Sequence, residues 1–199
     1  MSAVKDGSAP VRVVIAEDEA IIRLDLKETL EEEGYEVVGE TGRGDEAVSL
    51  VRDLQPDLAI LDIKMPGMDG IAAAREIATA RKAAVLILTA FSQRDLVEQA
   101  RDAGAIGYLV KPFQKTDLVP AIEIAIGRFA EMRALEKEVD SLEEQLTTRR
   151  IVEKAKGVLM DRDQLSESAA FSFIQQTAMR QRAKMRLVAE QVIDGTVTP

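Results

Sequence analysis

The sequence predicts an α/β protein in which a doubly wound, five-stranded parallel sheet is followed by a long helix and a small bundle of three helices. Two observations lead to this prediction. In the first part of the 199-residue chain, short apolar runs rich in β-branched residues alternate with segments of helical spacing. From about Phe129 onward only helical spacing remains. Alternation of strands and helices is typical of parallel sheets covered by helices on both faces.

The sheet is expected from five repeats of a strand followed by a helix. The first strand, VRVVIA, is the kind of run found in central parallel strands, and Gly34 is a stop signal for the helix after it. The expected strands are Val11–Ala16, Tyr35–Glu40, Asp57–Asp62, Ala84–Ala90 and Ile106–Val110. The expected helices are Ala20–Glu33, Glu46–Leu54, Ile71–Ala80, Arg94–Ala103 and one after Pro112. Ligands of such sheets bind outside the carboxyl ends of the strands.

A linker helix then carries apolar residues at intervals of three and four, with Glu and Lys between them. This spacing is the a/d pattern of a coiled coil. The seam is short, so a homodimer through Met132–Leu146 and packing within one chain both remain open. The seam residues are Met132, Leu135, Val139, Leu142 and Leu146.

The last part of the chain is expected to form three helices, with breaks near Asp163-Gln164 and near Gln181. Ser166 is a candidate N-cap for the second of these helices. The residues of that helix expected to face the core are Phe171, Ile174 and Ala178. The predicted boundaries are 1–10 for an N-terminal tail, 11–128 for the α/β domain, 129–148 for the linker helix, 149–195 for the bundle and 196–199 for a C-terminal tail.

Composition excludes several kinds of site. Cysteine and histidine are both absent, so disulfides, thiolate metal sites and imidazole chemistry are excluded. The chain shows no long uncharged apolar run and no apolar leader segment, so we expect a cytoplasmic protein without a membrane span. The net charge is −9, yet from Arg149 onward nine basic and six acidic residues give +3. The two parts of the chain are therefore expected to meet different partners.

Polar residues gather at the predicted carboxyl ends of the strands. Glu17 and Asp18 follow the first strand and Asp62 ends the third. Three carboxylates at one sheet edge repel one another unless a cation lies among them, and an oxygen-only ligand set favours Mg²⁺. Thr89 and Lys111, at the ends of the fourth and fifth strands, add a hydroxyl and an ammonium group. The set matches the needs of a phosphoryl group: charge neutralisation and a carboxylate that attacks phosphorus.

The motifs IAEDE, ILDIKMPGMDG, LTA and GYLVKPF, in this order, resemble the receiver domain of two-component response regulators, a flavodoxin-like fold. The resemblance implies that Asp62 accepts a phosphoryl group from a sensor histidine kinase, and that the protein's only chemistry is this transfer and its own dephosphorylation. It also implies a cis bond between Lys111 and Pro112. The implied roles are Mg²⁺ binding by Glu17, Asp18, Asp62 and the backbone carbonyl of Lys64, switching by Thr89 and Tyr108, and phosphate binding by Lys111.

The segment from Thr148 to Ile193 is similar to the ANTAR domain, the RNA-binding output of transcription antitermination regulators. The matching motifs are RxxVxxAKGVLM, LSExxAF and KxxxVA. The resemblance implies binding to RNA stem-loops and control of antitermination or of a post-transcriptional step. Gln164 and Arg182 depart from it, because the family commonly has Gly and Asn at these places. The implied RNA contacts are Arg149, Lys156 and Lys184, with Arg150, Lys154 and Arg182 as weaker candidates.

Two other functions fit part of the pattern. A DNA-binding regulator with a helix-turn-helix output would use the same receiver, although the C-terminal part shows no clear recognition helix. A Mg²⁺-dependent phosphatase would use the same carboxylates. Phosphatases of the haloacid-dehalogenase type carry a second acid two residues after the nucleophile, and Lys64 occupies that place here.

Overall fold

The computed structural model describes residues 9–90 and 94–199, so most of the predicted N-terminal tail, 1–10, lies outside the described residues. The chain divides into two compact units, Met1–Met132 and Arg133–Pro199. Within the described part, no helix is both long enough and apolar enough to cross a bilayer.

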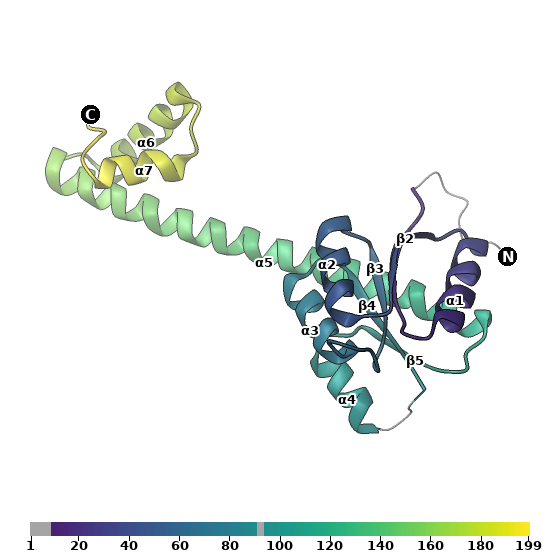
Figure 1. Ribbon diagram of the computed structural model, residues 1–199. Helices are drawn as coiled ribbons and strands as arrows, with labels where there is room; N and C mark the ends of the chain where they lie inside the picture. The colour runs from purple at the N-terminus through teal and green to yellow at the C-terminus, as the bar shows by residue number, and fades with distance from the viewer. Residues whose placement is uncertain (1–8, 91–93) are drawn as a thin grey trace. The chain divides into compact units, whose positions relative to one another are not determined.

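The first unit is built on the predicted five-stranded parallel sheet (Figure 1). Its strand order is β2-β1-β3-β4-β5. The central strands β3 and β4 are buried at every position, which explains their nearly continuous apolar sequences. The strands are β1 (Arg12–Ala16), β2 (Glu36–Thr41), β3 (Leu58–Asp62), β4 (Ala84–Thr89) and β5 (Gly107–Val110).

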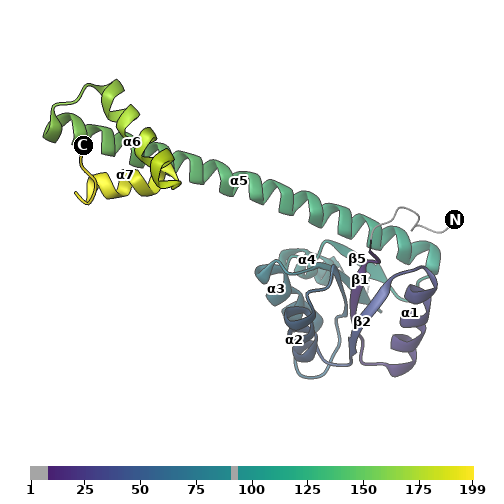
Figure 2. The same cartoon turned by 90° about the horizontal axis from the view of Figure 1, so that it is seen from above.

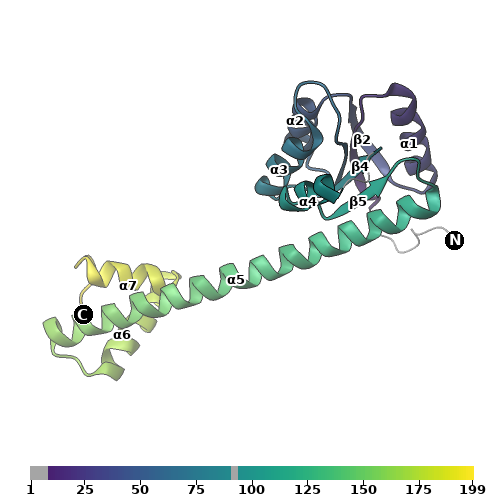
Figure 3. The same cartoon turned by 90° about the horizontal axis from the view of Figure 1, so that it is seen from below.

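Helices cover both faces of this sheet, as the repeat pattern predicted. Helices α2, α3 and α4 lie on one face, and α1 and the first turns of α5 lie on the other (Figures 2 and 3). An apolar core lies under each of these two groups of helices. The helices are α1 (Ala20–Glu32), α2 (Gly44–Leu54), α3 (Gly70–Ala80), α4 (Arg94–Asp102) and α5 (Lys115–Asp163).

Helix α2 begins at Gly44, two residues before the predicted Glu46. A Cβ atom at Gly44 would lie 2.2 Å from the carbonyl oxygen of Met68, so only glycine allows this approach. The predicted stop of the first helix is confirmed, because α1 ends at Glu32 and Gly34 has a φ of +89°.

Helix α5 combines segments that were predicted to be separate helices. The helix after Pro112, the linker helix and the first helix of the bundle form one continuous helix, Lys115–Asp163. Its only proline, Pro120, lies near the start, and no stop signal interrupts the seam. The boundaries at 128 and 148 are therefore not helix ends.

The second unit contains the end of α5 together with α6 (Glu167–Gln181) and α7 (Met185–Ile193). The predicted breaks near Asp163-Gln164 and Gln181 are confirmed. Ser166 caps α6, since its Oγ accepts a hydrogen bond from the backbone N–H of Ala169 at 3.3 Å. The fully or nearly fully buried side chains of this core are Val152, Ala155, Leu159, Ala170, Ile174, Ala178, Val188, Ala189 and Val192.

The prediction that Phe171 faces this core is wrong. Its side chain is 41% exposed, whereas Ile174 and Ala178 are buried as predicted. Ala170, one residue earlier, takes the inward position and is fully buried in the core of the bundle. The aromatic ring is thus left at the edge of the bundle.

Gln164 and Arg182, which depart from the family pattern, both adopt the left-handed conformation, with φ of +56° and +51°. Glycine and asparagine tolerate this region better than other residues. The two residues that depart from the family pattern therefore lie in the turns between the helices. A hydrogen bond offsets part of the cost of this conformation at Gln164, because its Nε2 donates to the carbonyl oxygen of Asp161 at 3.0 Å.

Replacing Arg182 by glycine is expected to stabilise the bundle by up to about 1 kcal/mol, because it removes the cost of the left-handed conformation. Gln175→Gly, in the exposed middle of the same helix, is the matched control and is expected to cost about 1 kcal/mol. Thermal unfolding followed by circular dichroism measures both. Equal destabilisation by the two glycines would contradict the prediction.

Candidate functional site

Three carboxylates meet at the carboxyl edge of the sheet. The ligand oxygens of Glu17, Asp18 and Asp62 all lie within 4.8 Å of one another. The pairing of β1 with β3, which aligns Ala16 with Leu61, brings them together. Glu17 and Asp62 are buried and Asp18 is exposed, so the cluster opens to solvent on one side.

Lys111 completes this centre. Its Nζ forms an ion pair with Oε2 of Glu17 and lies 3.4 Å from Oδ1 of Asp62. Its backbone N–H donates a hydrogen bond to the carbonyl oxygen of Thr89 at 2.8 Å, which ties the end of β5 to the end of β4. The Lys111-Pro112 bond is cis. One ammonium group against three carboxylates leaves the centre negatively charged.

Burial governs the protonation of the two inner carboxylates. The pKa of Asp62 is raised, mainly by burial, while Lys111 and a 2.8 Å hydrogen bond from the N–H of Ile63 oppose the rise. The pKa of Glu17 is raised by burial as well, and its ion pair with Lys111 is the largest opposing influence. Keeping Glu17 and Asp62 ionised therefore costs free energy, and an additional cation would offset this cost.

The loop after β3 requires glycine at its end. A Cβ atom on Gly70 would lie 1.9 Å from the carbonyl oxygen of Asp62, so the chain could not return this closely with any other residue. Asp69, one residue earlier, caps α3 by accepting a hydrogen bond from the N–H of Ala72 at 2.7 Å. Lys64 is exposed and, with Asp18, lines an open hollow beside the carboxylates.

Thr89 and Tyr108 lie on one face of the sheet. Thr89 is fully buried at the end of β4, and Tyr108 lies on β5 opposite Ile87, which precedes Thr89 by two residues. Because side chains two apart on a strand share a face, the threonine and the tyrosine are diagonal neighbours. Tyr108 is partly buried against the core under α2, α3 and α4, and burial raises its pKa.

In the second unit, the structure divides the predicted RNA contacts into two kinds. Lys156 is only 7% exposed, and its Nζ lies 2.9 Å from Glu153 and 2.6 Å from Glu167, which ties α5 to α6. The other predicted contacts are all exposed: Arg149, Arg150, Lys154, Arg182 and Lys184. Among these, Lys184 lies 3.0 Å from Oε1 of Glu144.

Lys156→Met is expected to lower the melting temperature of the bundle, because Glu153 and Glu167 lose the cation between them. The pKa of Glu167 is lowered, mainly by its hydrogen bond from Lys156. This pair therefore stabilises the fold above the ordinary glutamate pKa, and the stabilisation is lost as pH falls through the lowered value. The difference in melting temperature between wild type and variant should shrink in acid.

Lys154→Met, a neighbouring exposed lysine, is the matched control and should leave the melting temperature unchanged. If Lys156→Met melts like wild type but loses RNA affinity, Lys156 contacts RNA and has no structural role.

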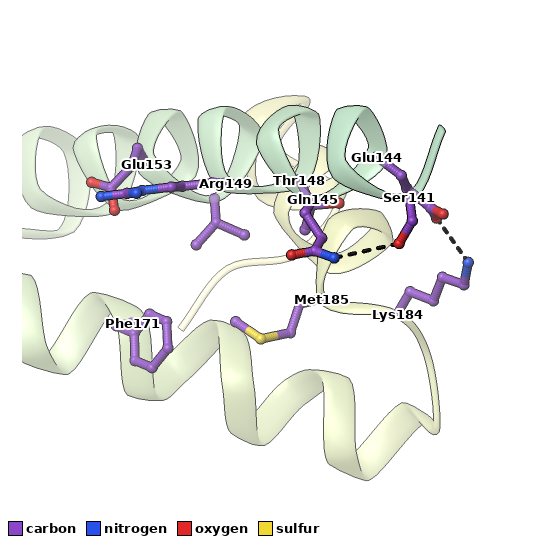
Figure 4. A pocket seen from close by; sticks show the side chains of 10 residues that line it. Ser141, Glu144, Gln145, Thr148, Arg149, Glu153, Phe171, Lys184 and Met185 are labelled. Carbon is purple, nitrogen blue, oxygen red and sulfur yellow. Dashed lines mark hydrogen bonds and ion pairs between the residues drawn. The ribbon is translucent and has the colours of Figure 1, made fainter. Parts of the chain in front are cut away.

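Sequence reasoning missed an apolar hollow beside Arg149 and Lys184, which the exposed Phe171 and the partly buried Met185 help to line (Figure 4). The helical spacing of Phe171 with Ile174 and Ala178 was a misleading signal. The structure shows that Ala170 and not Phe171 belongs to the buried core of the bundle.

Two family models match the chain. The model of the response regulator receiver domain matches residues 13–123, and the model of the ANTAR domain matches residues 140–193. Together they cover both the carboxylate centre and the bundle.

Full-length and partial relatives agree with these matches. The chain is 58% identical to the transcriptional regulatory protein PdtaR of Mycobacterium tuberculosis, over 98% of this chain and 95% of the relative. It is 41% identical to the chemotaxis protein CheY of Thermotoga maritima, over 56% of this chain and 93% of that protein.

Solved structures also resemble part of the chain. The signal receiver domain of the response regulator NarL from Mycobacterium tuberculosis matches with a TM-score of 0.58 and 33% identity, over 60% of this chain and 98% of that one. The CheX-CheY complex with BeF₃ and Mg²⁺ from Borrelia burgdorferi matches with a TM-score of 0.55 and 28% identity, over 57% and 87% of the two chains.

Proposed function

The chain belongs to the response regulators that join a receiver domain to an ANTAR domain, and from this premise we propose that phosphorylation of Asp62 controls RNA binding by the C-terminal helices. The observation that carries the proposal is the buried Asp62 carboxylate, adjacent to two further carboxylates and to Lys111 at the carboxyl edge of the sheet. Burying a carboxylate beside two others is costly, and a phosphoryl acceptor requires such a carboxylate.

The phosphoryl group comes from a histidine kinase, since this chain contains no histidine of its own. A carboxylate oxygen of Asp62 attacks phosphorus, the bond between phosphorus and the kinase imidazole nitrogen breaks, and the imidazole leaves with the electron pair. No external substrate is turned over, and hydrolysis of the acyl phosphate on Asp62 resets the protein.

The donor set fits Mg²⁺, because carboxylate and carbonyl oxygens are its preferred ligands and Asp18 leaves the cluster open to water. Glu17, Asp18, Asp62 and the backbone carbonyl of Lys64 would hold it. When bound, the ion would neutralise charge that develops on the transferred oxygens. Lys111, already between Glu17 and Asp62, would hold one phosphate oxygen as a fixed positive charge.

Thr89 and Tyr108 would transmit the effect of phosphorylation at Asp62 to the surface of the domain. Their diagonal placement on one face allows the Thr89 hydroxyl to bond a phosphate oxygen and Tyr108 to occupy the space that it leaves. The surface of α4, β5 and α5 changes as a result. Since α5 continues as one helix to Asp163, the same element carries the seam and the first part of the bundle.

Exposed cations of the bundle would bind the phosphates of RNA stem-loops, with Arg149 and Lys184 as the first candidates and Arg150, Lys154 and Arg182 around them. Lys156 would act through the fold, because two glutamates hold it. A homodimer would present two bundles to paired stem-loops, and the seam is suited to it because its apolar side chains are 41–63% exposed. We place the protein in the cytoplasm, with its RNA targets.

The test of this function compares RNA and DNA. Gel shifts of the full chain with stem-loop RNA and with duplex DNA should show preference for RNA, whereas preference for the duplex would favour a DNA-binding regulator instead. RNA crosslinked in cells and sequenced should differ between wild type and Asp62→Ala. Equal recovery would leave RNA binding in place and remove phosphorylation as its control.

A further inference from the structure

A hollow of about 480 Å³ lies on the second unit, between α5, α6 and the start of α7 (Figure 4). Its lining is more apolar than polar, which is unusual for a surface this rich in charge. At its centre, Phe171 from α6 and Met185 from α7 face α5 (Figure 4). We call it the Phe171 hollow; its lining residues are Ser141, Glu144, Gln145, Thr148, Arg149, Val152, Glu153, Phe171, Lys184 and Met185.

The Phe171 ring lies outside the buried core of the bundle. Its side chain is 41% exposed, although Ala170 and Ile174 beside it are fully buried. An exposed aromatic ring offers a flat apolar face at little cost in side-chain entropy. Within the bundle Phe173 is the other phenylalanine, and it is partly buried against the core, so Phe171 alone offers such a face.

The hollow is lined by two acidic and two basic side chains, and both acidic ones have a basic partner: Glu144 pairs with Lys184 and Glu153 with Lys156. Within the described residues from Arg149 onward, Glu153 and Glu167 are held by Lys156, Asp163 by Arg162 and Glu190 by Arg186. Asp161 and Asp194 have no basic partner among the described residues, whereas five basic side chains of this segment have no acidic partner there. These are Arg149, Arg150, Lys154, Arg180 and Arg182.

Arg149 is the member of this group that lines the hollow, on the opposite side from Phe171 (Figure 4). The polar end of the hollow is formed by the Lys184–Glu144 ion pair and by Gln145, whose Nε2 donates to the Ser141 hydroxyl at 3.4 Å. Figure 4 shows the Gln145 amide oxygen directed toward the middle of the hollow. A flat apolar face, an unpaired guanidinium and an amide edge together match one nucleotide.

We propose that the Phe171 hollow receives one unpaired base of the RNA, stacked on Phe171, with Arg149 on an adjacent phosphate and Gln145 at the base edge. This inference rests on the proposed RNA-binding function and assigns a site within it. Helical spacing predicted that Phe171 faces the core, and Gln145 falls in the predicted linker helix, so the sequence pattern predicts no RNA contact for either residue.

A second copy of the chain is a poorer occupant of this hollow. The seam residues Leu135, Val139, Leu142 and Leu146 share one face of α5, and the hollow residues Ser141, Gln145, Thr148 and Val152 lie about a third of a turn away. A dimer formed through the seam thus leaves the hollow open. Each protomer would then receive one base.

The experiment uses the full chain and a stem-loop RNA library with a randomised loop. The RNAs retained by wild type are made with 2-aminopurine at each loop position in turn. We expect binding to quench the fluorescence of one position, because stacking on Phe171 removes that base from water. Phe171→Leu should abolish this quenching and lower affinity about 5- to 150-fold, while Phe171→Trp should restore both.

Met179→Ala, which removes another exposed apolar side chain of α6, is the matched control and should bind RNA like wild type. Thermal unfolding of Phe171→Leu should stay near wild type, since the ring is partly exposed. If wild type retains no RNA, the proposed function fails. If wild type binds but Phe171→Leu binds equally well or keeps the quenching, the hollow is not the base site. A change in sedimentation of Phe171→Leu would instead make the hollow a protein interface.

Discussion

Asp62→Asn is expected to reduce phosphate incorporation from a phosphorylated histidine kinase, or from acetyl phosphate, to background. The amide lacks the nucleophilic carboxylate oxygen, which in the wild type lies 3.4 Å from the Nζ of Lys111. Incorporation of radiolabelled phosphate and intact-protein mass spectrometry measure the change. RNA affinity should then no longer respond to the phosphodonor.

Asp69→Asn is the matched control. Asp69 lies in the loop after β3 and caps α3, a role that asparagine fills equally well, so phosphorylation should continue. Phosphate that still appears on Asp62→Asn, for example on Asp18, would contradict the assignment.

The variant is expected to stay folded, so that lost phosphorylation reports on the missing carboxylate. Burial raises the pKa of Asp62, so its ionised form opposes folding at pH values above that raised pKa. As pH falls from the raised value toward the ordinary one, protonation in the folded state relieves this cost. Asn carries no charge at any of these pH values, so Asp62→Asn should be at least as stable as wild type at neutral pH.

The double variant Leu135→Lys, Leu142→Lys is expected to weaken self-association by roughly 1000-fold or more. Both side chains are more than half exposed in one chain, at 63% and 52%, and a coiled coil would bury them. Each lost leucine costs about 1.5–3 kcal/mol of burial and acts in both protomers. Sedimentation velocity, with and without phosphodonor, measures the effect.

The matched control is Leu187→Lys, a leucine of α7 that is 52% exposed and lies outside the seam. Its self-association should equal that of wild type. The double variant should bind single stem-loops normally and lose the extra affinity for paired ones. A wild type that stays monomeric at every concentration, with and without phosphodonor, would remove the dimer from the proposed mechanism.

The sequence predicted most of the first unit because its signals are local. A run of β-branched residues is typical of a strand in a parallel sheet. The residues at the carboxyl ends of such strands lie along the same end of the sheet. Glu17, Asp62 and Lys111 could therefore be placed together before their contacts were known, and the structure brings them together. The ion pair of Lys111 with Glu17 required the actual geometry, because side-chain reach depends on the strand register.

In the bundle, local signals were weaker. The motif that contains Lys156 predicted an RNA contact, yet the ammonium group lies between Glu153 and Glu167, which come from different helices. Spacing alone could not distinguish Phe171 from a core residue, since Ala170 and Phe171 differ by about 100° around the helix and either could face inward.

The sequence by itself determined the order of strands and helices, the carboxylates at the sheet edge and the apolar seam, because each depends on periodicity or on position at the end of an element. Only the tertiary structure decided that α5 is continuous, that Lys156 is enclosed and that Phe171 is open. The physical reason is that the exposure of a side chain depends on which other helices pack against it. The packing of α6 and α7 against α5 determines which side chains are buried. The spacing of apolar residues along each helix is compatible with more than one such packing.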